Sequence, residues 1–588
     1  MAADLTLTVL GTTDLHGNVF SWDYVQERAY ADESGNAVGL ARCASLIKRI
    51  RAERGAERCL TLDAGDTIQG TPLAHFFARV DPVTSGVTHP MAAAMNAVGY
   101  DAAALGNHEF NYGMDVLRAF QGQLDFPLLG ANALDWSGDW SAFPPYVIRE
   151  IRADGLPPLR VGVLGLVTPG VAIWDRANVE GRVRFTGVVE QAATSVARLK
   201  ADGADVVVVS CHSGTDADAT SYGDRIPYPE NASGLLAQEV PGVDAILVGH
   251  AHVEIEQRLI TNRRTGRPVL LSEPLCCGMR VSVMELDLHH GEDGWEVVER
   301  RARLLRASDA PEDPEVTDAV RAAHDRVVRY AGEVIGECDT ELSSATARYA
   351  ESRIVDLVNH VQATVLRDEL VGTESEGLPI FSVTSPFNRD SVVPAGAVSV
   401  RDLTGVYVHE STLLGVRMTG AELQAYLEHS ARYFRPVAGP GPWRPDELTG
   451  SPTDEAPYGS PDYNYDVLGA LDGQVAYDID LARPVGERIR GLTYAGRTLD
   501  PDGELVLAVN SYRQSGGGNF PAVATARVVH DRQQEVRQLL IEWVRRTGHI
   551  AVDDIPRTSW RLVAGGQPVK VSREVTSVHP SSHLSAPE

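Results

Sequence analysis

Five short segments of the chain place side chains that can bind metal ions directly after apolar runs. The segments are Asp14-Leu15-His16, Gly65-Asp66, Gly106-Asn107-His108-Glu109, His212 and Gly249-His250-Ala251-His252. Together they offer carboxylate, imidazole and amide-oxygen donors but no thiolate, a set that suits Mn, Fe, Zn, Mg or Ca. The number of donors fits two metal ions that share one carboxylate. Two neighbouring ions lower the pKa of a water molecule and hold phosphoryl oxygens during in-line attack, so the segments predict a two-metal phosphoesterase site.

Each segment alone is weak evidence for a metal site. An isolated Asp-x-His is usually a surface or capping pair, and the imidazoles of His250 and His252 share a face only where a strand continues. The prediction rests on the order of the five segments and on the strand-like run that precedes each of them.

The elements that must position these residues alternate along the first half of the chain, which is typical of a layered α/β domain. Strand-like runs are Leu5–Thr13, Cys59–Asp63, Arg160–Val167, Asp205–Ser210, Ala245–Val248 and Val269–Ser272, and helical patterns include Gly39–Arg51, Pro90–Val98 and Val188–Ala201. The runs are nearly continuously apolar, which indicates strands buried on both faces. Because ligands bind at the carboxyl ends of strands in open α/β sheets, we expect four strands to bring ligand residues to the same edge of the sheet.

The second half begins with a helix candidate at residues 313–337, where Asp313 can cap and Pro314 suits the first helical position. This helix either bridges two domains or packs at the edge of one. Beyond it, the pattern predicts mixed elements: helices at Ile354–Val365 and Gly420–Arg432, and strands at Val475–Ile479 and Leu505–Asn510.

Two further stretches are irregular. The proline-rich residues 436–461 form either a functional loop or a disordered insertion. The Ser- and Pro-rich tail after Val569 is expected to be disordered.

Length and charge limit the possible functions. A chain of 588 residues exceeds what one hydrophobic core supports, so two or three domains are expected. The formal net charge of −27 argues against binding a nucleic-acid polymer or an anionic membrane. A small phosphorylated substrate remains compatible with this charge, because bound cations would reverse the local field.

The segments that report on location point to the cytoplasm. The chain has six cysteines, and the adjacent Cys276 and Cys277 do not form a disulfide framework, which favours a reduced compartment. No signal peptide is visible before Leu5, and no apolar run reaches the ~20 residues that a membrane span needs.

The wording of the motifs resembles a known family. The segments Thr12–Asn18, Gly65–Leu73 and Gly106–Gly113 are similar to those of the calcineurin-like metallophosphoesterases, and within them of the two-domain 5′-nucleotidases and 2′,3′-cyclic-nucleotide phosphodiesterases. The resemblance runs from Leu5 to about Leu562. It implies a four-layer α/β/β/α domain at residues 1–308, a linker helix at 309–338, an α+β nucleoside-binding domain at 339–565 and a disordered tail at 566–588.

The resemblance assigns the metal ligands residue by residue. Asp66 would bridge two divalent ions, and His108 would stabilise the transition state, with Asn107 beside it, and is a candidate to protonate the leaving oxygen. The first ion would be bound by Asp14, His16, Asp66 and His252, and the second by Asp66, Asn107, His212 and His250.

Asn111 separates two branches of the family. The 5′-nucleotidases typically carry Asp at this position, where the carboxylate orients the imidazole and favours its charged form. Asn111 can accept the imidazole N–H but adds no charge, so we expect a less basic His108. On this reading, Asn111→Asp should move the acidic limb of the pH–rate profile to higher pH.

The nucleoside end also resembles the cyclic-phosphodiesterase branch. Tyr463 and Tyr512 match the two aromatic rings that sandwich the nucleobase in this family, with Tyr465 as a rival to Tyr463 and core packing as the alternative for each. Stacking tolerates any base, so broad base specificity is expected. Gly517 lies in a glycine run that lets backbone approach a ligand closely. Asn388 and Arg389 occupy the position of the family's substrate loop, which here lacks paired glycines.

The resemblance therefore implies an enzyme that opens 2′,3′-cyclic nucleotides to 3′-nucleotides and then hydrolyses 3′-nucleotides. One alternative is a 5′-nucleotidase or nucleotide-sugar hydrolase of the same fold, and another is a non-catalytic binding protein on this fold. The expected partner is a small nucleotide, and the sequence leaves the oligomeric state open. Members of the family are often exported, which stands against the cytoplasmic expectation.

Overall fold

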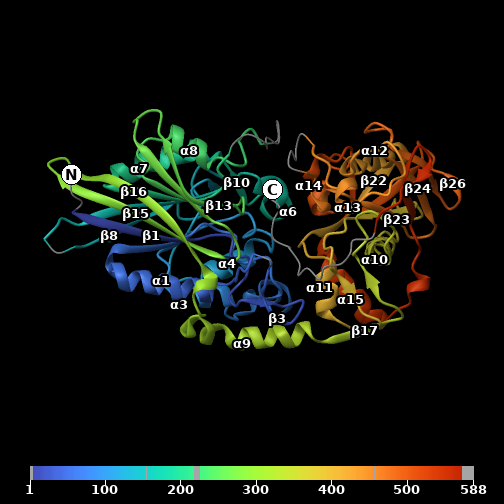
Figure 1. The fold of residues 1–588 in the computed structure, drawn as a ribbon, viewed down its shortest axis with the longest axis horizontal. Helices are drawn as coiled ribbons and strands as arrows, with labels where there is room; N and C mark the ends of the chain where they lie inside the picture. The colour runs from blue at the N-terminus through green and yellow to red at the C-terminus, as the bar shows by residue number, and fades with distance from the viewer. Residues whose placement is uncertain (1–3, 33, 154, 217–225, 454–458, 573–588) are drawn as a thin grey trace. The chain divides into compact units, whose positions relative to one another are not determined.

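Two six-stranded sheets lie at the centre of the first 328 residues (Figure 1). The structure is a computed structural model that describes residues 4–32, 34–153, 155–216, 226–453 and 459–572. The first sheet has the order β16-β15-β1-β4-β5-β6, with β1 (Leu5–Thr12), β4 (Cys59–Asp63), β5 (Ala102–Ala104), β6 (Leu128–Leu129), β15 (Arg280–Gly291) and β16 (Gly294–Arg306). The second has the order β13-β14-β12-β11-β9-β8, with β8 (Tyr146–Ile151), β9 (Leu159–Val167), β11 (Val206–His212), β12 (Ala245–Gly249), β13 (Glu254–Thr261) and β14 (Pro268–Pro274).

Four neighbouring strands of each sheet run parallel. In the first sheet these are β1, β4, β5 and β6, and in the second they are β9, β11, β12 and β14. Antiparallel strands complete both sheets, namely β15 and β16 in the first and β8 and β13 in the second. Each sheet therefore has an edge at which several parallel strands end.

Helices cover the outer faces of the two sheets. Side chains of both sheets, such as Leu62 of β4 and Val208 of β11, share one apolar cluster between them. On the far side of the second sheet, Val209 packs with α7 (Val188–Ala201) and α8 (Ser233–Glu239). On the first sheet, α1 (Leu40–Arg54) contacts β1, β4 and β15, and α3 (Pro90–Val98) packs on α1. These are the four layers α/β/β/α that the resemblance implies.

The prediction that the ligand-bearing strands share one sheet is wrong. Asp14, Asp66 and Asn107 follow strands of the first sheet. In the second sheet, His212 is the last residue of β11, and His250 directly follows β12. Hydrophobic periodicity cannot make this distinction, because strands of both sheets are buried on two faces and read as similar apolar runs. The run before Gly106 is strand β5, whose bounds the pattern does not give because its three alanines carry no β-branched signal.

Helix α9 (Pro314–Ala331) begins where the sequence predicts, and Asp313 accepts the backbone N–H of Val316 at 3.1 Å. The helix ends at Ala331, so the predicted helix to residue 337 and the linker helix to 338 are wrong at their ends. Val334–Cys338 form strand β17 instead, between β21 (Gly396–Ser399) and β29 (His549–Ile550). The β-branched Val334 and Ile335 favour a strand once neighbouring strands offer backbone partners.

A boundary between Val328 and Arg329 divides the chain into two units, which we call the N-terminal and C-terminal units. The C-terminal unit has one apolar core and mixes helices and strands. Its predicted elements are confirmed as α10 (Arg353–Glu369), α12 (Gly420–Ser430), β24 (Val475–Asp480) and β27 (Glu504–Asn510). Its five-stranded sheets have the orders β23-β19-β27-β22-β28 and β26-β25-β24-β30-β31, with β19 (Ile380–Thr384), β22 (Thr412–Thr419), β23 (Val467–Ala470), β25 (Ile489–Tyr494), β26 (Arg497–Thr498), β28 (Arg527–Glu535), β30 (Ser559–Ala564) and β31 (Gln567–Pro568).

The predicted irregular stretches are partly structured. The loop at 436–461 contains the short helix α13 (Pro445–Leu448), and its residues 454–458 lie outside the described residues. A disordered tail from residue 566 is wrong at its start, because β31 pairs with β30 and Val571 bridges to Trp443. The rest of the predicted tail, from residue 573, lies outside the described residues.

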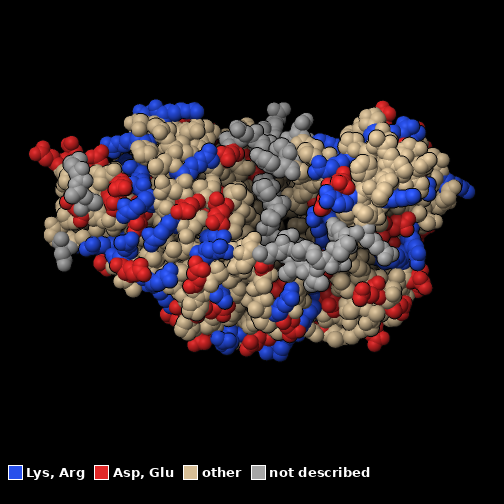
Figure 2. Space-filling model, in the orientation of Figure 1, with Lys and Arg blue, Asp and Glu red and all other residues tan. Residues whose placement is uncertain are grey.

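The surface carries charges of both signs, and the cysteines lie inside the protein. Lys and Arg side chains are interspersed with Asp and Glu over the face shown in Figure 2. All six cysteines are buried and free. Among the residues that the structure describes, no helix is both long and apolar enough to cross a membrane.

Candidate metal centre and nucleoside-binding residues

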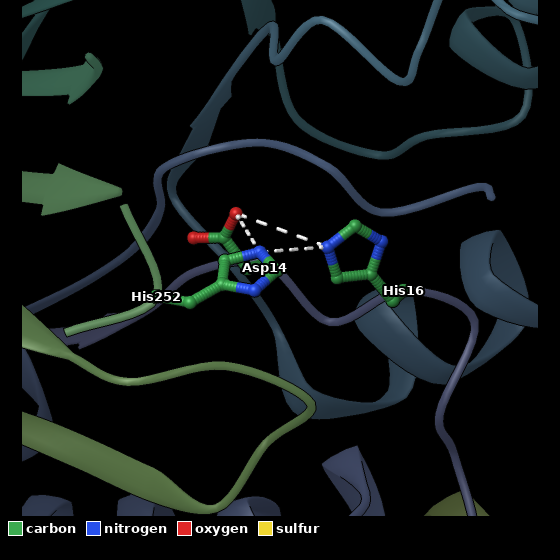
Figure 3. Close-up of side chains that lie close together, drawn as sticks. All are labelled: Asp14, His16 and His252. Atoms are coloured by element: carbon green, nitrogen blue, oxygen red, sulfur yellow. Dashed lines mark hydrogen bonds and ion pairs between the residues drawn. The ribbon is translucent and has the colours of Figure 1, made fainter. Parts of the chain in front are cut away.

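The side chains of Asp14, His16 and His252 point toward one another (Figure 3). His252 Nε2 lies 3.2 Å from Asp14 Oδ1 and 3.1 Å from His16 Nε2, and His16 Nε2 lies 3.9 Å from the same carboxylate oxygen. Within the described chain Asp14 Oδ1 is buried and accepts no hydrogen bond. Two imidazole nitrogens that face each other and an unsatisfied carboxylate oxygen suit a cation better than they suit one another.

Asp66, His212 and His250 form a second group of the same kind. His212 Nε2 lies 3.0 Å from Asp66 Oδ2 and 3.0 Å from the amide oxygen of Asn107. The other ring nitrogen, Nδ1, donates to the carbonyl of Ala64 at 2.7 Å, which fixes Nε2 toward the carboxylate. The structure thus places six of the predicted ligands in two groups, with Asn107 beside the second. Asp66 lies in the second group, and its sharing with the first group stays a prediction.

A second layer of side chains holds the imidazoles in place. His250 Nε2 lies 2.9 Å from the carboxylate of buried Glu230, which leaves Nδ1 as the nitrogen available to a metal. His16 Nδ1 lies 3.2 Å from both the carbonyl and the side-chain oxygen of Gln69. Metal-binding histidines usually donate their other N–H in this way. Glu230 was not predicted, since it follows a loop and no strand.

The backbone at the predicted ligands is strained. A positive φ is uncommon for a residue with a side chain and is concentrated at functional sites. Five of the twelve non-glycine residues with positive φ in the described chain are predicted ligands: Asp14 (49°), His16 (46°), Asp66 (57°), His250 (86°) and His252 (53°). The strain is therefore independent evidence that these loops are shaped for a ligand.

Buried Glu109 connects the loops that carry Asp66 and Asn107. Its carboxylate accepts the backbone N–H groups of Asp66 at 2.8 Å, Thr67 at 2.6 Å and Gly106 at 2.6 Å. Gly106 is required for this approach, since a Cβ there would lie 2.2 Å from Asp66 Oδ1. Glu109 thus acts as a brace between the ends of β4 and β5.

The carboxylates and imidazoles of the two groups shift one another's pKa values. Burial alone would raise the pKa of Asp14 and of Asp66, but the imidazoles of His252 and His212 outweigh it and lower both. Burial would lower the pKa of His212, yet the two carboxylates raise it to about 10. Burial and the neighbouring His252 lower the pKa of His16 to about 4. Closely packed carboxylates and imidazoles of this kind fit divalent metal ions.

His108 lies beside both groups. Its Nε2 is 4.0 Å from Asp66 Oδ2, its ring centroid is 5.4 Å from that of His16, and its side chain is 32% exposed. Its Nδ1 lies 2.6 Å from the side-chain oxygen of Asn111, as the sequence predicts. The Nε2 end is therefore the end that a substrate can reach.

A segment that the sequence did not single out lies behind Asn111. It comprises the short helices α5 (Val171–Trp174) and α6 (Arg176–Val179). Asn111 donates to Asp175 at 2.9 Å, and Asn178 donates to the carbonyl of Asn111 at 3.2 Å. The indole of Trp174 stacks on His250, with centroids 5.7 Å apart at 27°. The one available signal was that this segment follows predicted strand Arg160–Val167, whose end lies at the ligand edge.

In the C-terminal unit, Tyr463 and Tyr512 are half-buried neighbours with ring centroids 6.4 Å apart at 83°. The edge-to-face geometry means that one ring must turn before a base can fit between two parallel faces. Tyr465 is buried and stacks on Tyr433 at 5.0 Å and 14°, so it belongs to the core and is no rival to Tyr463.

An ion pair beneath the two tyrosines joins their segments. Arg513 Nε lies 2.8 Å from Asp466 Oδ2, and both side chains are almost fully buried. Arg513 also donates to the side chain of Asn464 at 3.0 Å and to the carbonyl of Tyr463. A Cβ at Gly517 would lie 2.4 Å from the Tyr512 ring, so this glycine allows the ring to rest on backbone.

The side chains of Asn388 and Arg389 form hydrogen bonds within the protein. Asn388 donates to the carbonyl of Gly405 at 2.9 Å and accepts the N–H of Asp390 at 3.0 Å. Arg389 contacts Asp462 through two nitrogens, at 2.6 and 3.1 Å, next to Tyr463. Both residues shape the loop beside the tyrosines.

Known proteins match this arrangement over most of the chain. The family model for calcineurin-like phosphoesterases matches residues 7–254, and that for the 5′-nucleotidase C-terminal domain matches residues 334–525. The chain is 31% identical to a 2′,3′-cyclic-nucleotide 2′-phosphodiesterase/3′-nucleotidase from Salmonella typhimurium, covering 95% of this chain and 89% of that protein. It is also 31% identical to the trifunctional nucleotide phosphoesterase protein YfkN from Bacillus subtilis over 92% of this chain, and spans 38% of that longer protein.

A solved structure has the same fold. It is the 5′-nucleotidase precursor from Thermus thermophilus, with a TM-score of 0.60 and 23% identity over 97% of this chain and 100% of that one. Metallophosphoesterases use divalent metal ions, and this chain has two groups of side chains that can bind them. The chain belongs to the calcineurin-like metallophosphoesterases that comprise the 5′-nucleotidases and the 2′,3′-cyclic-nucleotide 2′-phosphodiesterase/3′-nucleotidases.

Proposed function

We propose that this protein opens 2′,3′-cyclic nucleotides to 3′-nucleotides and then hydrolyses the 3′-nucleotides to nucleoside and phosphate. The observation that carries the proposal is the pair of ligand groups around Asp14 and Asp66 with His108 beside them. The relatives that share about 30% of their residues with this chain and bear that name support it.

We assign one divalent ion to each ligand group, with Asp66 shared between the ions. Asp14, His16 and His252 complete the first set, and Asn107, His212 and His250 complete the second. The bound ions would supply the Lewis acidity that lowers the pKa of an attacking water and neutralises phosphoryl oxygens. The donor set accepts Mn, Zn, Fe, Mg or Ca.

His108 acts as the general acid that protonates the leaving oxygen. Its Nδ1–H is donated to Asn111, so the proton available for transfer is on Nε2, the nitrogen that faces the ligand groups. A protonated Nε2 donates to the oxygen that leaves phosphorus, and in the transition state it also stabilises negative charge. Asn107 adjoins His108 in the chain, and its amide oxygen lies 3.0 Å from His212 Nε2, on the side of the second ligand group.

The nucleobase binds between Tyr463 and Tyr512 after one ring turns. Stacking on two aromatic faces needs no particular pattern of hydrogen bonds, so all four bases should be accepted. Gly517 leaves room for the Tyr512 ring, and Arg389 and Asn388 hold the adjoining loop. The match of these positions to the cyclic-phosphodiesterase branch, together with Asn111, favours cyclic nucleotides over 5′-nucleotides.

Side-by-side turnover of 2′,3′-cyclic AMP, 3′-AMP and 5′-AMP tests the proposal, with Mn, Zn, Mg and Ca each supplied to metal-free protein. The proposal predicts the highest kcat/KM for 2′,3′-cyclic AMP. A preference for 5′-AMP or for a nucleotide sugar would instead identify a 5′-nucleotidase or nucleotide-sugar hydrolase. Elemental analysis accompanies the assay, because a full-length protein that binds no divalent ion would be a non-catalytic binding protein. The cytoplasmic location stays a prediction.

A further inference from the structure

Asp175 faces the catalytic histidine through one intervening side chain. Asp175 Oδ1 accepts the amide N–H of Asn111 at 2.9 Å, and Asn111 Oδ1 lies 2.6 Å from His108 Nδ1. The three residues come from separate places in the chain: His108 and Asn111 follow β5, and Asp175 lies between α5 and α6.

The charge of Asp175 fixes which group donates and which accepts in the two hydrogen bonds that join Asp175, Asn111 and His108. An ionised carboxylate is only an acceptor, whereas an asparagine amide can present either its oxygen or its nitrogen. Facing Asp175, Asn111 must present its NH₂ group, and so its oxygen must face His108. The oxygen in turn requires a proton on His108 Nδ1, which leaves Nε2 as the nitrogen whose proton can be exchanged with a substrate.

Asp175 occupies a costly position for a carboxylate. Its side chain is 5% exposed, and within the described chain Oδ2 is buried and has no hydrogen-bond partner. Oδ1 also receives a longer contact, at 3.4 Å, from the side-chain amide of Asn178. Burial raises the pKa of Asp175 to about 6, while the Asn111 hydrogen bond and the nearby His108 favour its charged form. Packing alone would be served better by an apolar or fully bonded side chain.

We propose that Asp175 is a positioning residue that fixes the orientation of the Asn111 amide and, through it, the tautomer of His108. The inference rests on the proposed role of His108 in the reaction. It makes Asp175 a part of the site that neither the metal motifs nor the spacing of the ligands indicates.

The test exchanges the carboxylate and the amide. Asp175→Asn keeps the shape but allows either amide orientation, so kcat should fall by about tenfold to a hundredfold with KM little changed. Asn111→Asp alone, the substitution that the sequence suggests, puts two carboxylates in contact in a buried place and should lower kcat further. The double variant Asn111→Asp/Asp175→Asn restores one carboxylate and one amide, and its kcat should return to within about threefold of wild type.

The matched control is Glu180→Gln, an acid-to-amide change at the end of the same segment. Glu180 is exposed and pairs with Arg176, so this variant should retain wild-type kcat. Metal content and thermal stability of every variant are measured to show that it is folded and loaded. A double variant as weak as the product of the single effects, or an Asp175→Asn variant with unchanged kcat, would overturn the inference.

Two choices separate this inference from the proposed function. The kcat of each variant is measured with 2′,3′-cyclic AMP and with bis(p-nitrophenyl) phosphate. If the protein does not hydrolyse the nucleotide, hydrolysis of the generic phosphodiester still reports on Asp175. Independently of activity, ¹H–¹⁵N spectra of the zinc-loaded full chain with labelled histidine report the tautomer. The inference requires a protonated Nδ1 on His108 that is lost or mixed in Asp175→Asn and restored in the double variant. The same tautomer in all variants would reject it.

Discussion

The carboxylate of Glu230 and the imidazole of His250 form a buried pair behind the second ligand group. Their atoms are 2.9 Å apart, and both side chains are 2% exposed. Because His250 Nε2 is engaged, Nδ1 is the nitrogen left for the proposed metal ion, and the carboxylate increases the basicity of that nitrogen. The pair should matter for metal affinity more than for the chemical step.

Glu230→Gln should therefore weaken metal binding about tenfold to a hundredfold, with kcat at saturating metal nearly unchanged. The measurement titrates metal-free protein with Mn and follows activity and heat. Glu239→Gln is the matched control, since Glu239 lies on the same stretch of chain but pairs with Arg263 at the surface. Equal metal affinity in the two variants would show that Glu230 is only a packing residue.

Tyr512 is the residue whose loss should separate substrate binding from chemistry. Removing one stacking face costs about 1–3 kcal/mol, so Tyr512→Ala should raise KM about fivefold to a hundredfold with little change in kcat. Tyr512→Phe keeps the face and should resemble wild type, and Tyr477→Phe, in the buried core, controls for a lost hydroxyl. A fall in kcat with unchanged KM would place Tyr512 outside the nucleoside site.

Residues were predictable where they follow a predicted strand. Asp14, Asp66, His212 and His250 each come after an apolar run, so their convergence could be inferred from the sequence. Glu230 and Asp175 were not predictable, because they act on His250 and Asn111 across contacts that only the tertiary structure creates. A carboxylate in a loop carries no periodic signal, and its partner lies 20 or 64 positions away along the chain.

At the scale of elements, the N-terminus of α3 has an unusual cap. His89 Nδ1 accepts the backbone N–H of Met91 at 3.2 Å, and its Nε2 is buried and unpartnered within the described chain. Burial lowers the pKa of His89 to about 3. The cap therefore requires a neutral imidazole in the folded protein, whereas the unfolded chain takes up a proton below about pH 6.5.

Because of this difference in pKa, the free energy of unfolding decreases as the pH is lowered. Between about pH 6.5 and pH 3 the unfolded state binds one more proton, so the free energy of unfolding decreases by about 1.4 kcal/mol for each unit that the pH falls. His89→Asn keeps a capping acceptor and should lack this part of the dependence, about 2 kcal/mol between pH 6.5 and pH 5. Urea unfolding of metal-free protein at about pH 7 and about pH 5 measures it. Exposed His549→Asn is the control, and a parallel fall in His89→Asn and wild type would contradict the assignment.

Strong periodic elements were predicted well, and short ones were not. The bounds of α3 and α7 match the helical patterns in the sequence because their apolar residues recur at helical spacing over several turns. The bounds of β5 and the change from helix α9 to strand β17 were not predicted, because strands distant in the sequence pair with β5 and β17 and so determine both. The assignment of strands to two sheets was missed for the same reason.

Each of the two units has its own apolar core, and the seven proposed metal ligands all belong to the N-terminal unit. Metal binding should therefore stabilise that unit, by about 2.7 kcal/mol at a hundredfold excess over Kd. Calorimetry of the full chain should show one transition that moves upward with Mn and one that does not. Asp66→Asn, which removes the shared ligand, should abolish the movement. Equal shifts of both transitions would mean that the units unfold together.

In the proposed function, the metal groups and His108 open a cyclic phosphodiester and release a 3′-nucleotide. Chromatography of the products of 2′,3′-cyclic AMP tests it most directly, with metal-loaded full-length protein and with His108→Ala as the control. We expect 3′-AMP to appear first and adenosine to follow, and His108→Ala to slow the release of 3′-AMP by about a hundredfold or more. Formation of 2′-AMP, or intact 2′,3′-cyclic AMP in a preparation that hydrolyses 5′-AMP, would contradict it.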